Sequence, residues 1–192
     1  MHNEKSALRT RLLSERRALS PRAREAAADA LAGHAGELAG PGATVAAYVS
    51  VGAEPGTRPL LDALRARGVR VLLPVLLADN DLDWAEYEGA EALAPAGRGL
   101  VEPVGARLGP EAVTGASLVL LPGLAVDRRG LRLGRGGGSY DRVLARLGRA
   151  GARPLLAVLL YEHELLERVP AEPHDLPVDV ALTPAGPHRL AR

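Results

Sequence analysis

The chain of 192 residues contains no cysteine. A disulfide framework, a thiolate metal site and a cysteine nucleophile are therefore excluded. The sequence also lacks an apolar stretch long enough to span a membrane, and its first residues lack the apolar core of a signal peptide. These absences predict a soluble, cytoplasmic protein that has no membrane partner.

Phenylalanine and isoleucine are absent too, and Lys5 is the only lysine. Arginine, alanine, glycine, leucine and valine are abundant instead, which is a bias typical of GC-rich genomes. A missing phenylalanine or lysine at one position therefore carries little weight. The retained Lys5 favours a position that needs a compact, strongly hydrated ammonium group, with chance as the alternative for a single residue.

A large net charge is also missing. The 24 basic and 23 acidic residues give a formal net charge of +1 at pH 7. Nucleic-acid binding needs a broad excess of positive charge, so we expect no nucleic-acid partner and only a local basic patch. The length is that of one domain, residues 1–192, with a sizeable core, and we expect it to be a monomer.

Apolar runs that are typical of buried strands alternate with helical patterns along the chain. The runs occupy residues 44–49, 69–73, 117–121, 155–160 and 178–182. The helical patterns occupy residues 5–19, 20–38, 57–68, 139–147 and 161–168. Residues 82–88 alternate and predict an outer strand with Trp84 as a core residue, and residues 92–98 predict a loop. This order predicts an α/β fold with a mostly parallel sheet, helices on its faces and two N-terminal helices.

One stretch, residues 120–147, combines a buried strand, a polar loop, the glycine-rich segment from Gly134 to Gly138 and a helix that begins at Ser139. This arrangement is typical of phosphate binding. Glycines let successive backbone N–H groups approach an anion, and the positive end of the helix dipole adds to the attraction. The glycine spacing matches neither the P-loop nor the dinucleotide fingerprint.

Charged residues flank the glycine-rich segment. Arg132 and Arg135 supply permanent charge and planar groups that suit phosphate oxygens. Asp141 is a hard oxygen ligand at the position where a phosphate-bound Mg²⁺ would arrive. A flexible surface loop with solvated arginines is the alternative, and the flanking charges favour nucleotide phosphate.

The segments PGLAVD (residues 122–127) and RLGRGGGSYDR (residues 132–142) resemble the signature of the 5-formyltetrahydrofolate cyclo-ligase family, PGLAFD followed by RLGxGxGYYDR. Three positions depart from it. Val126 replaces the usual Phe, Gly137 the usual Lys and Ser139 a Tyr. The resemblance covers nearly the whole chain and implies a single three-layer α/β/α domain.

The resemblance also implies a reaction. Enzymes of this family convert 5-formyltetrahydrofolate and ATP to 5,10-methenyltetrahydrofolate, ADP and phosphate, with Mg²⁺ as cofactor. The formyl oxygen attacks the γ-phosphate, and the amine at position 10 of the folate then displaces phosphate. Such chemistry needs positioning and charge neutralisation rather than a covalent nucleophile, which suits a chain without cysteine.

An ATP site follows from the resemblance. The family has an N-terminal K-x-x-x-R in this site, which Lys5 and Arg9 match, although spacing alone equally fits a solvated basic face. Arg135 is the nearest candidate to supply the charge of the missing lysine, so we expect it to be catalytic together with Lys5. The expected ATP-binding residues are Lys5, Arg9, Arg132, Leu133, Gly134, Arg135, Gly136, Gly137, Gly138, Ser139 and Tyr140.

The folate and metal sites follow in the same way. Val49, Ser50 and Glu54 are expected to contact the pterin end of the folate, although Glu54 would otherwise be an exposed loop carboxylate. Residues 99–103 resemble a family segment along the substrate cleft. Asp141 and Asp175 are the expected Mg²⁺ ligands, with Asp179 as the competitor in the tail. His174 and Asp175 also fit a metal or catalytic pair, or simply a turn.

Two other functions remain open. A sugar-phosphate isomerase or CoA-transferase-like enzyme would use the glycine loop for a substrate phosphate and Glu54 as a base. A non-catalytic nucleotide-binding relative would have lost activity through the changes at Gly137 and Ser139.

Overall fold

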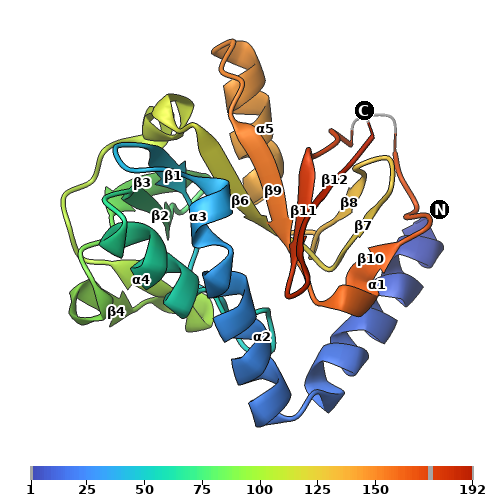
Figure 1. Ribbon diagram of the computed structural model, residues 1–192. Helices are drawn as coiled ribbons and strands as arrows, with labels where there is room; N and C mark the ends of the chain where they lie inside the picture. The colour runs from blue at the N-terminus through green and yellow to red at the C-terminus, as the bar shows by residue number, and fades with distance from the viewer. Residues whose placement is uncertain (1, 173–174, 192) are drawn as a thin grey trace.

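The computed structural model describes residues 2–172 and 175–191 (Figure 1). Its centre is a seven-stranded sheet with the order β12-β11-β9-β6-β1-β2-β3. The inner pairs are parallel, and the pairs β2·β3 and β11·β12 at the two edges are antiparallel. The strands are β1 (Thr44–Ala46), β2 (Arg70–Leu76), β3 (Leu82–Glu86), β6 (Leu118–Pro122), β9 (Leu155–Leu159), β11 (Val180–Thr183) and β12 (Gly186–Arg189). The predicted mostly parallel sheet is confirmed.

Helices cover both faces of this sheet (Figure 1). They are α1 (His2–Ala18), α2 (Pro21–Gly33), α3 (Ala35–Leu38), α4 (Arg58–Ala66) and α5 (Ser139–Arg149). The side chains of β6 alternate, so that Leu118 and Leu120 pack with α2 and α4, and Val119 and Leu121 pack with α5. A continuously apolar strand is needed because both faces are covered. The predicted three-layer α/β/α arrangement is confirmed.

Two small sheets accompany the central one. One consists of β10 (Leu165–Leu166), β7 (Ala125–Asp127) and β8 (Arg132–Leu133), and the other of β4 (Leu93–Pro95) and β5 (Val101–Pro103). The first small sheet lies beside α1 (Figure 1), where Leu12 packs against Ala125 and Leu133. The short 3₁₀ helices are η1 (Ala90–Ala92), η2 (Gly97–Gly99), η3 (Pro110–Gly115) and η4 (Glu162–Glu164). The loop predicted for residues 92–98 is therefore wrong.

Strand β2 continues through Pro74, where the sequence predicts its end. Arg70 donates its N–H to Ala43 O, and Leu72 O accepts from Ala47 N, so alternate residues of β2 face β1. The nitrogen of Pro74 lies past the end of β1, whose pairing with β2 ends at Leu72. The missing N–H of Pro74 therefore removes no hydrogen bond between the two strands. Its other side pairs with Trp84 of β3.

Two helical predictions also need correction. The helix predicted for residues 161–168 is wrong, because η4 leads directly into β10 there. The helix predicted for residues 20–38 breaks at His34 into α2 and α3. Thr57 occupies the N-cap position of α4, but its Oγ1 accepts from Ser50 N at 2.8 Å instead of capping the helix.

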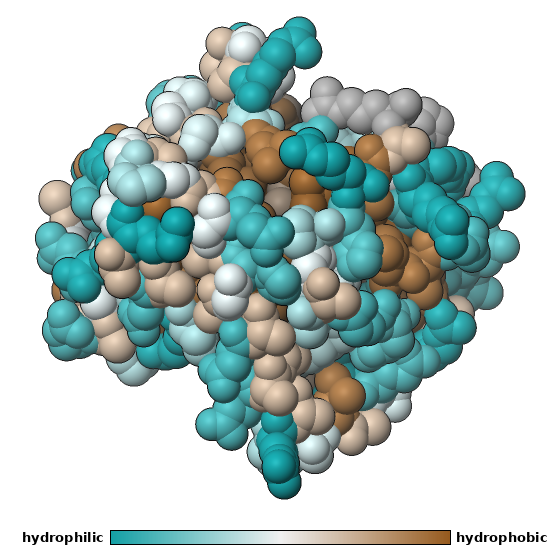
Figure 2. Space-filling model, viewed as in Figure 1, coloured by the Kyte–Doolittle hydropathy of each residue, from teal (hydrophilic) through white to brown (hydrophobic). Residues whose placement is uncertain are grey.

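The strand predicted as the last, residues 178–182, corresponds to β11 and is followed by β12. Hydrophilic side chains cover most of the face seen in Figure 2, with apolar residues visible in scattered patches. Among the residues that the structure describes, no helix has the length and apolarity needed to cross a bilayer.

Candidate active site

A cavity of about 600 Å³ lies where the parallel strands end. Its lining includes Tyr48 and Val49 after β1, Leu76 at the end of β2, and Pro122 and Gly123 at the end of β6. The chain leaves β1 towards β2 on one side, whereas β6 and β9 follow on the other side. Ligands of open α/β sheets bind at such a reversal of strand order.

The glycine-rich segment forms one wall of the cavity. Gly136 and Gly138 have φ of 95° and 77°, a backbone conformation that favours glycine, and Gly138 is the N-cap of α5. A Cβ atom at Gly134 would lie 2.8 Å from Arg132 Nη1. Gly137 differs, because no described heavy atom lies within 4 Å of a Cβ atom built there and its φ is unexceptional.

Arg132 and Arg9 are fixed beside this segment. Arg132 donates from Nη1 to Pro122 O at 2.9 Å and from Nη2 to Asp141 Oδ1 at 3.1 Å. Burial lowers the pKa of Arg132, although Asp141 opposes this effect. Arg9 donates from Nε to Gly134 O at 2.9 Å, which joins α1 to the glycine-rich segment. Two guanidinium groups from distant parts of the chain thus face the same wall.

Lys5 is buried, so the alternative of a solvated basic face is wrong for this residue. Its Nζ donates to Glu172 Oε2 at 3.1 Å and to Asp175 Oδ2 at 2.8 Å. Burial favours the neutral amine, but the bonds to the two carboxylates outweigh it and raise the pKa of Lys5. Lys5 is therefore an ammonium group at neutral pH, held at the cavity by the tail of the chain.

The acidic candidates occupy different places. Asp141 and Asp175 both line the cavity, each in an ion pair, with Arg132 and Lys5 respectively. Asp179 lies outside the cavity lining, and its Oδ2 accepts from Leu156 N at 2.9 Å. His174 lies outside the described residues.

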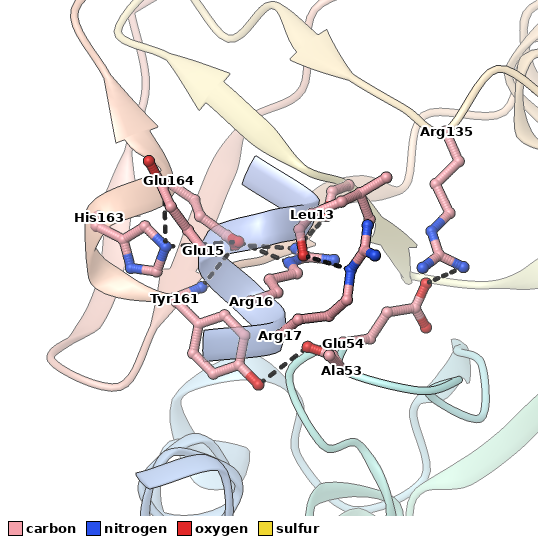
Figure 3. Close-up of polar contacts among 11 residues, drawn as sticks. Leu13, Glu15, Arg16, Arg17, Ala53, Glu54, Arg135, Tyr161, His163 and Glu164 are labelled. Carbon is pink, nitrogen blue, oxygen red and sulfur yellow. Dashed lines mark hydrogen bonds and ion pairs between the residues drawn. The ribbon is translucent and has the colours of Figure 1, made fainter. Parts of the chain in front are cut away.

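Glu54 lies on the opposite wall and contacts the glycine-rich segment through Arg135 (Figure 3). Its Oε2 accepts from Val51 N at 2.7 Å, and its Oε1 lies 3.7 Å from Arg135 Nη1. The Glu54 side chain is only 9% exposed, so it is not an exposed loop carboxylate. Ser50, in contrast, does not line the cavity, because its N–H and hydroxyl both bond to Thr57.

All the other residues proposed for the ATP and folate sites line the one cavity, including Leu133, Ser139 and Tyr140. Burial, with Glu54 nearby, raises the pKa of the Tyr140 hydroxyl. The segment predicted along the substrate cleft contributes Leu100, Val101 and Glu102. The sequence motifs therefore locate most of the lining correctly.

Several lining residues are missed by the motifs. Tyr48 directly follows β1, and burial together with Glu54 raises its pKa well above the ordinary value, which keeps its hydroxyl protonated. Its place at the carboxyl end of a predicted strand is a signal that could have found it. Leu82, Leu144 and Glu172 come from elements far apart in sequence, and no local pattern marks them.

The carboxylate groups in the cavity lining suit a metal ion that binds together with a phosphate ligand. Within the described ranges, no group of three or more His, Cys, Asp or Glu side chains could hold a metal ion. Asp141 and Asp175 nevertheless present carboxylate oxygens to the cavity. Mg²⁺ is commonly held by one or two carboxylates together with substrate phosphates. These residues fit Mg²⁺ shared with a nucleotide rather than a permanent protein-only site.

The fold is an open α/β sheet, and a glycine-rich segment and fixed cations lie at the carboxyl ends of its parallel strands. These features define an α/β protein that binds an anionic ligand at this end of the sheet. Comparison with known proteins gives the family. The model of the 5-formyltetrahydrofolate cyclo-ligase family matches residues 1–184. The chain belongs to this family of enzymes, as the motifs predict.

Individual relatives agree with this assignment. The chain is 46% identical over 187 residues to a Mycolicibacterium smegmatis protein named 5-formyltetrahydrofolate cyclo-ligase, with 94% of this chain and 93% of the relative covered. It is 32% identical to the Escherichia coli K12 protein of the same name, over 74% and 78% of the two chains. The solved structure of Aquifex aeolicus 5,10-methenyltetrahydrofolate synthetase matches with a TM-score of 0.80 at 29% identity, covering 98% of this chain and 93% of that one.

Proposed function

We propose that the protein catalyses the ATP-dependent cyclisation of 5-formyltetrahydrofolate to 5,10-methenyltetrahydrofolate, with ADP and phosphate as the other products. One observation carries the proposal beyond family membership. The N-terminal residues Lys5 and Arg9, the glycine-rich segment and Glu54 line one cavity, although they lie far apart in sequence. The bond from Arg9 to Gly134 O joins the first two groups, and the Arg135–Glu54 contact joins the last two.

The difficulty of the reaction is the formyl oxygen, which is a poor leaving group. In the proposed sequence this oxygen forms a bond to the γ-phosphorus while the bond from phosphorus to the ADP oxygen breaks. The amine at position 10 of the folate then attacks the formyl carbon, loses its proton and expels phosphate. The protein has to align the two substrates and stabilise charge on the transferring group.

At the phosphate end, Arg132 is held by Pro122 O and Arg9 by Gly134 O, so neither guanidinium group has to reorganise during the reaction. Preorganised donors of this kind stabilise charge that develops in the transition state. Lys5 adds an ammonium group from α1. Backbone N–H groups of the glycine-rich segment and the N-terminus of α5 complete the phosphate site.

At the folate end, Glu54 is fixed by Val51 N and can accept hydrogen bonds from the N–H groups of the pterin. Tyr48 keeps its proton and offers a hydroxyl beside it. Apolar residues of the cavity, including Leu76, Leu82 and Leu100, cover the flat ring and exclude water. Because Arg135 contacts Glu54, the formyl group would lie between the folate and phosphate ends.

Asp141 and Asp175 would hold Mg²⁺ with the nucleotide, and the ion would neutralise part of the phosphate charge. Both carboxylates are now paired with cations, Asp141 with Arg132 and Asp175 with Lys5. Loading of the site would therefore make these two cations available to the phosphates, with Arg132 still held in place by Pro122 O. This exchange keeps the charge balanced in a cavity that is partly shielded from solvent.

The test is absorbance of the methenyl product in mixtures of purified protein, 5-formyltetrahydrofolate, ATP and Mg²⁺. We expect product only when protein, folate and ATP are all present, and removal of Mg²⁺ with a chelator should slow the reaction strongly. ATP binding without turnover would support the non-catalytic alternative instead. Binding of a sugar phosphate in the absence of ATP, without any product, would support the isomerase or transferase alternative.

A further inference from the structure

Helix α1 carries Lys5 and Arg9 to the cavity, and it docks through a short apolar stripe together with two buried cations. Leu12 is buried, and Leu8 and Leu13 are partly buried in the same apolar cluster. Lys5 and Arg16 are buried as well, although both are charged. With 3.6 residues per turn, positions 5, 9, 12 and 16 share one face of the helix. A surface helix normally docks through an apolar stripe. Apolar contacts are non-directional, so the rotation and axial position of α1 depend on what its buried cations bind.

Arg16 makes the firmest of these contacts (Figure 3). It donates from Nε to Glu164 Oε1 at 2.6 Å and from Nη2 to Glu164 Oε2 at 2.9 Å. The Arg16 and Glu164 side chains are 1% and 0% exposed. Glu164 is itself fixed, because its Oε2 accepts from Tyr161 N at 2.9 Å. Two parallel bonds between planar groups restrict rotation of the helix as well as its distance from the body.

Stability alone does not account for this pair. Two buried charges lose their hydration, and well-packed apolar side chains of the same volume are often at least as stabilising. A bidentate pair differs from an apolar contact in its directionality. The pair is therefore better suited to setting a geometry than to adding stability.

The Arg16–Glu164 pair is connected to the cavity through the backbone at the end of β6. Nη2 of Arg16 also donates to Gly123 O at 2.6 Å, and the preceding carbonyl, Pro122 O, accepts from Arg132. Two successive carbonyl groups at the end of β6 thus hold Arg16 of α1 and Arg132, which lies beside the glycine-rich segment. Arg16 itself does not line the cavity and lies eleven residues, roughly 16 Å along the helix, from Lys5.

We propose that the Arg16–Glu164 pair is a positioning pair that sets the rotation and axial position of α1, so that Lys5 and Arg9 meet the phosphates at the glycine-rich segment. The pair acts through those two cations and touches no substrate. This inference rests on the proposed ATP site.

The first two variants separate the effect of the two parallel hydrogen bonds from the effect of the charge. Arg16→Lys keeps a positive charge but loses the two parallel bonds, and Glu164→Gln keeps the shape of its partner but loses its charge. For both we expect the KM for ATP to rise, or kcat to fall, by about tenfold or more. The KM for 5-formyltetrahydrofolate should change by less than about twofold.

Two control variants test for a merely structural effect. Arg17→Lys alters the neighbouring exposed arginine, whose Nε bonds to Leu13 O of its own helix, and should leave both KM values unchanged (Figure 3). Leu31→Ala opens a cavity in the core, away from α1, and should lower Tm. Assayed well below its Tm, it should keep the ATP parameters of the wild type. An equal loss of ATP affinity in Leu31→Ala would overturn the inference.

The decisive measurement is a mutant cycle on ATP affinity, in which Arg16→Lys is made both in the wild type and in the Lys5→Ala, Arg9→Ala double variant. If Arg16 acts through these cations, adding Arg16→Lys there should weaken ATP binding no further. A full additional loss would overturn the inference. ATP affinity is measured by calorimetry and turnover by product absorbance. The affinities test the role of Arg16, and the turnover of the wild type tests the proposed function. A wild type that binds ATP without turnover would contradict the proposed function, while the same affinities would still decide the inference.

Discussion

Arg135 differs from the other cavity cations because its side chain is half exposed and its contact with Glu54 is long, at 3.7 Å. Arg9 and Arg132 are fixed by backbone carbonyls. We therefore propose that Arg135 follows charge from the γ-phosphate to the formyl oxygen, the task expected of the family lysine that Gly137 replaces.

Replacing Arg135 should accordingly affect the chemical step. We expect Arg135→Ala to lower kcat by about a hundredfold with little change in the KM for 5-formyltetrahydrofolate. Steady-state kinetics measured by product absorbance provide the check. The exposed Arg65→Ala on α4 serves as control and should behave like the wild type. Equal losses in kcat and folate affinity would contradict a role in the chemical step.

Gly137 can accept the lysine that the family carries. Apart from its chain neighbours, no described heavy atom lies within 4 Å of a Cβ atom at this position, and its φ is outside the left-handed range that favours glycine. We expect Gly137→Lys to keep Tm and to raise kcat or lower the KM for ATP. Gly136→Ala, where φ is 95°, should instead destabilise the fold by about 1–3 kcal/mol. A Gly137→Lys variant with a strongly lowered Tm or lower kcat would contradict this account.

At the scale of elements, His34 joins α2 to α3 and to the end of β11. Its ring nitrogens contact Glu37 Oε1 at 2.6 Å and Pro184 O at 3.2 Å. The bond to Glu37 raises the pKa of His34 above its ordinary value of 6.5, although burial opposes it. A raised pKa in the folded state means that the stabilisation is complete below pH 6.5 and is lost as the pH rises through the folded pKa.

The free energy of unfolding should therefore respond to pH through this junction. We expect His34→Ala to cost more stability near pH 5.5 than near pH 8.5 in urea titrations. Glu37→Gln should reduce the difference between the two pH values. A cost for His34→Ala that is the same at both values would show that the charge of His34 contributes nothing.

The elements predicted best are those with long apolar patterns. Residues 117–121, 139–147 and 155–160 correspond closely to β6, α5 and β9, because a buried strand or an amphipathic helix leaves a period in the sequence. The short strands β7 and β8 have no apolar run that extends beyond them, as β1 has in residues 44–49, and they are missed for that reason. The contacts of Arg16 with Glu164 and of Lys5 with Asp175 join residues more than a hundred positions apart. Such pairings follow from tertiary packing, and no local pattern could predict them.

At the scale of the whole molecule, the N-terminal helix meets the segment before β11, because Lys5 binds Glu172 and Asp175, and both segments contribute to one cavity. We propose that residues 1–192 fold as one domain. Trp84, the only tryptophan, is fully buried against the sheet and reports on the core, whereas circular dichroism reports mainly on the helices. The two probes should show one coincident unfolding transition. Separate midpoints would contradict a single cooperative domain.

In the proposed reaction, the formyl oxygen attacks the γ-phosphate of ATP inside this cavity. The most direct test uses 5-formyltetrahydrofolate labelled with oxygen-18 in the formyl group, with mass analysis of the released phosphate after turnover with ATP. Attack by the formyl oxygen should leave one labelled oxygen in each released phosphate and none in ADP. Unlabelled phosphate, together with label in water, would show that the formyl oxygen leaves by another route and would contradict the proposed mechanism.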